Sequence, residues 1–157
     1  MKKIISGLII IGILAFTMVG CGASGQKEPV PYSKMTEFDT DTIGSSKDLI
    51  KELGNPKTII TETKDMEAII EGVIQNLELP RKTGDISRDA VNEVGYSQFI
   101  EIAEDRLETV SSLEGNENFK VLEYRTISSK NEEYSNYFIF DNEEYITTFW
   151  DMSPYIY

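Results

Sequence analysis

The chain begins with a long apolar run that has no counterpart further along the sequence. Lys2 and Lys3 give a cationic start, residues from Ile4 to Val19 are mostly apolar, and small residues follow. This three-part order is typical of a secretory signal. The run is slightly shorter than the roughly 17 to 25 residues of a spanning helix, and Gly7 and Gly12 interrupt it. We therefore expect a cleaved signal rather than a retained anchor.

A short helix is predicted from Ser45 to Leu53. Ser45 can cap its first turn, with Asp48 three positions later as in a capping box, and Gly54 favours termination. The β-branched residues from Lys57 to Thr63 then predict a strand.

Two longer helices are predicted from apolar residues spaced three and four apart. The first runs from Asp65 to Leu79 and should end at Pro80, with a loop over residues 81–89. The second should begin near Ser97 and end before Gly115. The residues expected to face the core from this second helix are Phe99, Ile102, Ala103, Leu107 and Val110.

The apolar period changes to two after Phe119, which predicts three strands. They cover Phe119 to Thr126, Tyr134 to Phe140 and Tyr145 to Trp150, with a turn over residues 141–144. The predicted fold class is α+β, with about three helices packed on one face of a small antiparallel sheet.

Most of the aromatic residues lie in these strands, and strand alternation assigns them to two faces. If Phe140 pairs with Tyr145, one face carries Phe138, Phe140, Tyr145, Thr147 and Phe149. The other face is the candidate partner-binding surface if the helices leave it open; burial under another segment is the alternative. Its candidate residues are Tyr137, Ile139, Ile146 and Trp150.

The segment between the signal and the first helix contains Gly, Ser, Pro and charged residues without an apolar period. We expect a signal peptide over residues 1–20, a flexible tether over 21–36 and a single domain over 37–157.

Charge excludes one class of partner. The chain has 15 basic and 27 acidic residues, and removal of Lys2 and Lys3 with the signal would leave 13 basic residues. An acidic protein repels phosphate backbones, so we expect no nucleic-acid partner.

Met18, Val19, Gly20 and Cys21 resemble the lipobox of bacterial lipoproteins, although Met18 stands where Leu is usual. The resemblance implies that Cys21 receives a diacylglycerol, with acyl chains such as palmitate, and becomes the first mature residue. The implied location is the extracytoplasmic face of the cell membrane, with the membrane contacted through the N-terminal lipid.

A second resemblance covers short stretches within residues 45–63 and 119–150. LIKELGNP and the later YFIF and YITTFW resemble small uncharacterised lipoproteins of low-GC Gram-positive bacteria. The order of elements is also similar to the β-lactamase-inhibitor-like and SmpA-like folds. No functional residue is implied by either resemblance.

The inventory of reactive side chains is small. The chain has no histidine and one cysteine, so triads of the Ser-His or Cys-His type and zinc sites built on these residues are excluded once Cys21 is lipidated. We expect no cofactor and no catalytic residue. A weak calcium site at Asp141, Asn142, Glu143 and Glu144 is the remaining metal hypothesis, against an acidic solvated turn.

Two functional hypotheses remain from different classes. The first is a membrane-anchored binding module, including immunity or inhibitor roles, whose partner is an unknown protein or cell-envelope component. The alternative is an extracytoplasmic hydrolase that uses two carboxylates on cell-wall glycan.

Overall fold

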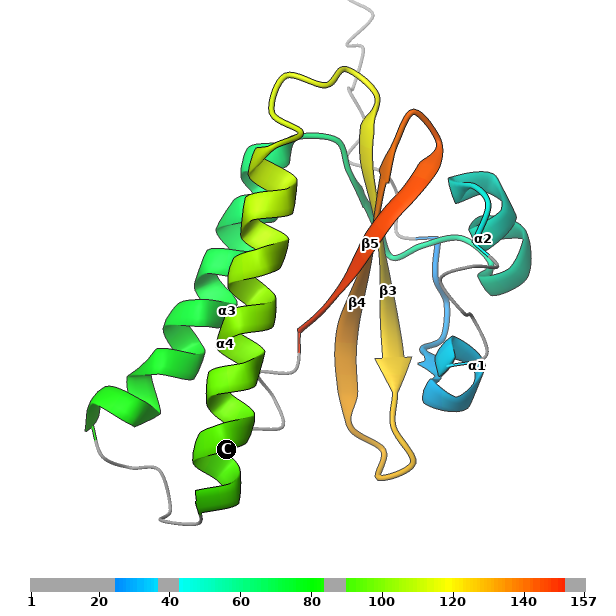
Figure 1. Ribbon diagram of the computed structural model, residues 1–157. Coiled ribbons are helices and arrows are strands. Elements are labelled where there is room, and N and C mark those ends of the chain that lie inside the picture. The colour runs from blue at the N-terminus through cyan, green and yellow to red at the C-terminus, as the bar shows by residue number, and fades with distance from the viewer. Residues whose placement is uncertain (1–24, 37–42, 84–89, 152–157) are drawn as a thin grey trace, which may run out of the picture.

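The computed structural model describes residues 25–36, 43–83 and 90–151. Helices and strands alternate irregularly along this part of the chain (Figure 1). The α+β class predicted from the sequence is confirmed. The elements are β1 (Val30–Pro31), α1 (Tyr32–Thr36), α2 (Ser46–Leu53), β2 (Thr58–Ile60), α3 (Thr63–Thr83), α4 (Ala90–Ser111), β3 (Phe119–Ile127), β4 (Glu133–Asp141) and β5 (Glu144–Asp151).

Strand β3 is the centre of the sheet. On one side it pairs antiparallel with β4, which pairs antiparallel with β5. On its other side it pairs antiparallel with β2 around Leu122 and parallel with β1 at Thr126 and Ile127. The sheet is thus antiparallel except for this one short parallel pairing.

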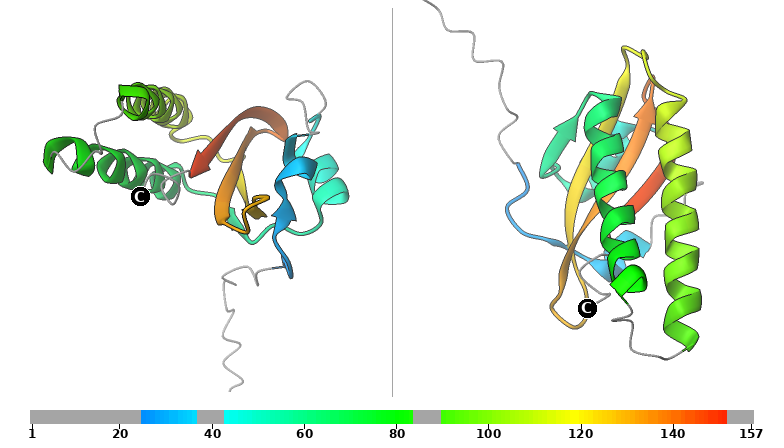
Figure 2. Two further views of the ribbon diagram at one scale, coloured as in Figure 1. Left: turned by 90° about the horizontal axis from the view of Figure 1, so that it is seen from below. Right: turned by 90° about the vertical axis from the view of Figure 1, so that its left-hand side faces the viewer.

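Helices cover both faces of the sheet (Figures 1 and 2). The long helices α3 and α4 lie side by side on one face, and the short helices α1 and α2 lie on the other. The expectation that the helices gather on one face therefore holds for the long pair only. Leu49 of α2 packs with Phe138 and Phe140. Without α2, these large apolar side chains of the sheet would be exposed to water.

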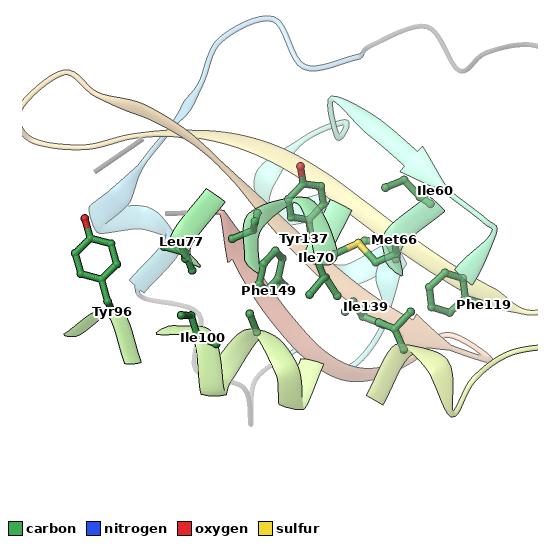
Figure 3. Packing of buried hydrophobic residues seen from close by; sticks show 14 residues of the cluster. Ile60, Met66, Ile70, Leu77, Tyr96, Ile100, Phe119, Tyr137, Ile139 and Phe149 are labelled. Carbon is green, nitrogen blue, oxygen red and sulfur yellow. The ribbon is translucent and has the colours of Figure 1, made fainter. Parts of the chain in front are cut away.

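The larger of the two hydrophobic clusters lies between the long helices and the sheet (Figure 3). Met66 and Ile70 of α3 and Val110 of α4 are fully buried there. Each such side chain contributes about 1.5–3 kcal/mol by leaving water. The sheet supplies Ile60, Phe119, Val121, Tyr137, Ile139 and Phe149 to this cluster.

Helix α4 differs from its prediction in start and in face. It begins at Ala90 rather than near Ser97. The sequence pattern places the start too late because Gly95 weakens the helical signal, although a single glycine does not break a helix. Phe99 and Ile102 are 36% and 48% exposed instead of facing the core. A stripe with spacings of four and three faces the core instead, made by Tyr96, Ile100, Ala103, Leu107 and Val110.

Helix α3 also extends beyond its predicted end. It begins at Thr63 and continues through Pro80 to Thr83. A proline removes one backbone donor and strains the preceding turn, but α3 continues for three residues beyond it.

The short helix α2 is capped as predicted. The Ser45 hydroxyl accepts a hydrogen bond from the Asp48 backbone N–H at 3.2 Å and donates to the Asp48 carboxylate at 2.7 Å. Gly54 follows the helix with φ +84°, a conformation that favours glycine, and its N–H donates to the Ile50 carbonyl at 2.9 Å.

Residues 25–36, which the sequence assigned to a flexible tether, belong to the folded domain. The Gly25 N–H donates to the Pro56 carbonyl at 3.3 Å. The Gln26 side chain bonds to both backbone groups of Arg125 at 2.8 Å, so it mimics a further rung of the β1–β3 pairing. Val30 and Met35 are 7% and 6% exposed, and their burial holds β1 and α1 on the sheet.

Candidate functional site

The four residues of the predicted partner-binding face do not form one surface. Tyr137 and Ile139 are 6% and 0% exposed, because they face the long helices. Ile146 and Trp150 are 37% and 40% exposed. The prediction of a single open face made by these residues is therefore wrong.

A β-bulge explains the difference. Phe140 pairs with Tyr145 as expected, but Ile139 pairs with Thr147, so Ile146 is an additional residue in β5. An extra residue reverses the facing of every later side chain in the strand. Phe149 consequently stacks on Tyr137, with ring centroids 6.1 Å apart, and Trp150 lies on the opposite face.

The remaining sequence-based sites lie in two places. Cys21 and the lipobox lie outside the described residues. In the turn after β4, Asn142 and Glu143 have φ of +49° and +68°, and Glu143 bonds to Lys120 at 2.6 Å. These contacts give the acidic turn a structural role.

The described ranges 25–36, 43–83 and 90–151 contain no alternative metal site. Within them, no three Asp, Glu, Cys or His side chains come together as a metal site would require. None of the helices in the same ranges has the length and apolar character to cross a membrane.

An aromatic pocket lies on the sheet face that carries α1 and α2. We define the aromatic pocket by its lining: Tyr32, Ser128, Ser129, Lys130, Glu132, Tyr134 and Trp150. Its cavity is about 240 Å³ and opens to solvent. Helix α1, strands β4 and β5 and the β3–β4 turn thus meet at one place.

Three rings form the aromatic walls. The Tyr32 and Trp150 ring centroids are 6.1 Å apart with planes at 87°, and those of Tyr32 and Tyr134 are 6.2 Å apart at 57°. Tyr32 and Trp150 are 41% and 40% exposed, whereas Tyr134 is buried. The three rings are therefore not stacked in parallel, and all three line the aromatic pocket.

The β3–β4 turn forms the polar rim, and hydrogen bonds hold its shape. The Ser128 hydroxyl accepts from the backbone N–H groups of Lys130 and Glu132 at 3.1 and 3.2 Å. The Ser128 N–H donates to the Glu132 carbonyl at 2.9 Å, and Asn131 adopts φ +65°. The rim is therefore a preformed wall of the pocket.

Glu123 is the only charged residue among the buried residues that the structure describes. Burial raises its pKa, but hydrogen bonds from Lys57 and Ser135 and the Lys57 charge outweigh burial, so the pKa lies below the ordinary 4.5. The Lys57–Glu123 pair is 2.5 Å long. Burial, reinforced by the charge of Glu123, raises the pKa of Tyr137 to about 12, so this phenol stays neutral. Both groups belong to the structural core.

Sequence reasoning identified one wall of the aromatic pocket and missed the others. Trp150 was among the predicted binding residues, whereas Tyr32 lies in the predicted tether and Tyr134 was counted as a strand residue. A five-residue helix such as α1 is too short to produce a periodic signal.

Comparison of the chain with family models, with curated proteins and with solved structures found no match. The resemblances to lipoproteins and to the SmpA-like fold therefore stay predictions.

Proposed function

We propose that this chain is a lipid-anchored binding module of the cell envelope, and that the aromatic pocket holds a group of its partner. The observation that carries the proposal is the exposure of the Tyr32 and Trp150 walls beside a preformed rim. Large aromatic side chains bury much area at low entropic cost, which is why they dominate binding sites.

The anchor is the part of the proposal that rests on sequence. Cys21 follows Met18-Val19-Gly20 directly after the apolar run, and it is the only cysteine of the chain. A thiol carrying a diacylglycerol inserts two chains into the membrane, at about 0.8 kcal/mol for each buried CH₂.

The binding role fits the chemistry of the pocket better than hydrolysis does. A glycosidase of the usual type needs two carboxyl groups facing one another across the substrate. Of the residues that line the aromatic pocket, Glu132 alone carries a carboxylate. No observation favours the hydrolase, so binding is the function we propose.

The anchor is tested by replacing the lipidated residue. Cys21→Ser should leave the chain unacylated and release it from the membrane fraction, and mass spectrometry of the wild-type N-terminus should show the diacylglycerol. A Cys21→Ser protein that fractionates with membranes at mature size would contradict the anchor.

The binding role is tested by cross-linking in intact cells. A photoreactive residue at Ser129, on the pocket rim, should give a discrete cross-linked product that disappears when Trp150 is changed to Ala. The matched control places the same photoreactive residue at Glu104, which is exposed on α4 and does not line the pocket. Equal cross-linking from both positions, or a product insensitive to Trp150→Ala, would contradict a partner at the pocket.

A further inference from the structure

The size and lining of the aromatic pocket restrict what it can hold. A cavity of about 240 Å³ is smaller than the roughly 300–1,000 Å³ typical of sites that enclose a whole drug-sized ligand. It accommodates one compact group. Its walls are three aromatic rings, and the turn that carries Lys130 and Glu132 forms its rim.

The polar groups of the rim are largely committed to the fold. The Ser128 hydroxyl already accepts two backbone N–H groups and lies 3.5 Å from the Glu132 carboxylate. A ligand recognised through many hydroxyl groups, such as a sugar ring, needs several donors and acceptors aimed at it. The aromatic pocket instead offers ring faces.

Ring faces attract cations. The π-system of an aromatic side chain carries negative charge over its face, and cages of several rings recognise quaternary ammonium groups. Tyr32 and Trp150 stand at 87° to one another and Tyr134 is tilted by 57° from Tyr32, so the three rings present faces in different directions. Tyr32 and Trp150 are the more exposed of the three and leave ring surface open to a ligand.

Charge favours the same ligand. The chain has a formal net charge of -12, and the Glu132 carboxylate lines the pocket. A cation is therefore attracted by the acidic surface and by the Glu132 carboxylate, whose attraction Lys130 on the rim partly offsets. Lys130 on the rim is suited to an anionic group attached to that cation.

We propose that the aromatic pocket formed by Tyr32, Tyr134 and Trp150 binds a quaternary ammonium group, the head of a small choline-like or betaine-like molecule. This inference rests on the proposed function, because it names the ligand chemistry of the same site. The methyl groups pack against the rings, the charge interacts with the ring faces, and Glu132 adds attraction from the rim.

The test compares choline with 3,3-dimethylbutanol, its neutral isostere, on the protein purified in a maltoside detergent that contains no ammonium group. Trp150 is the only tryptophan of the chain, so its fluorescence reports the pocket directly. Choline should give a saturable change, and the isostere should bind about fivefold more weakly or worse, as expected for loss of a cation–π contribution. Glycine betaine and phosphocholine, compared with choline, report whether Lys130 prefers a carboxylate or a phosphate.

Calorimetric titration of variants completes the test, since it does not depend on Trp150 fluorescence. Trp150→Leu and Tyr32→Leu keep apolar bulk but remove a ring face. Each should weaken the binding of choline at least fivefold and should weaken the binding of the isostere much less. Phe99→Leu, at an exposed aromatic residue of α4 outside the pocket, is the control and should leave choline affinity unchanged.

Two outcomes would overturn the inference. Equal affinity for choline and its isostere would show a simple apolar pocket, and no saturable binding of choline would exclude the cation. Neither result decides the proposed function, because cross-linking from Ser129 and its dependence on Trp150 measure partner binding separately.

Discussion

Glu123 lies in the middle of β3 with a carboxylate that is almost removed from solvent. Its side chain is 8% exposed, it is paired with Lys57 at 2.5 Å, and it accepts a hydrogen bond from the Ser135 hydroxyl at 2.7 Å. A buried carboxylate with these partners is stabilising only while it is ionised. Low pH should therefore reduce the stability of the fold by protonating Glu123.

We predict a pH-dependent contribution from Glu123. Its pKa in the folded chain is below the ordinary 4.5, so its contribution is fully present above about pH 4.5 and is lost as the pH falls through the folded pKa. Urea unfolding from about pH 6 to about pH 3 should show a steeper loss of unfolding free energy for the wild type than for Glu123→Gln. Glu104→Gln, at an exposed site, should follow the wild type.

Lys57 gives the complementary measurement. Lys57→Met retains the length of the side chain but leaves the Glu123 carboxylate without its cation, which should cost about 2 kcal/mol at neutral pH. A Lys57→Met protein as stable as the wild type would show that the remaining hydrogen bonds, from Ser135 and Thr58, compensate for burial of the carboxylate.

At the scale of elements, the bulge in β5 decides which aromatic side chains reach the core. Ile146 has no partner in the regular ladder, and Thr147, the residue after it, pairs with Ile139. Phe149 is 3% exposed under the long helices as a result. One additional residue thus assigns Phe149 to the core and Trp150 to the aromatic pocket.

We predict that β5 tolerates a first single-residue deletion but not a second. Deletion of Ile146 removes the bulge and keeps every later pair, so the fold should persist at a cost of about 1 kcal/mol. Further deletion of Thr148 from that variant has no bulge left to absorb it, so it moves Phe149 to the other face and should cost about 3 kcal/mol or more. Chemical denaturation followed by circular dichroism measures both; similar stabilities would show that β5 can shift its register freely.

The same elements show what the sequence could reveal. Alternation of apolar residues predicted β3, β4 and β5 to within one residue at each end, because a half-buried strand requires it. The bulge cannot be recognised in that pattern. With or without it, one of the two neighbours Phe149 and Trp150 turns an aromatic ring toward the core, so the alternation looks the same. The aromatic pocket could not be predicted from local patterns because it depends on a pairing between distant parts of the chain. The pairing of β1 with β3 places Tyr32, at the start of α1, beside the pocket.

At the scale of the whole molecule, the folded domain begins earlier than the sequence indicated. Gln26, Val30 and Met35 are buried, and together they attach the first described segment to β3 and to the second hydrophobic cluster. The predicted boundary at residue 37 would cut this segment away. The strand and helix that it contains also position Tyr32 at the aromatic pocket.

We predict that the two possible starting points give proteins of very different stability. A chain of residues 25–157 should unfold cooperatively with the stability of the longer mature chain. A chain of residues 37–157 loses two buried apolar side chains and the Gln26 hydrogen bonds, which is about 5 kcal/mol. That loss is comparable to the whole stability of many domains. Thermal melts of the two chains check this, and equal melting temperatures would contradict it.

The early start of the fold also sets how far the domain could travel from a lipid. Cys21 precedes Gly25 by four positions, and four residues span at most about 14 Å. A domain attached to the lipid by so short a segment would diffuse in the plane of the bilayer, and its pocket would stay in a thin layer above the headgroups. Its encounters would then depend on density per unit area of membrane, and a second membrane component would meet it at a high effective concentration.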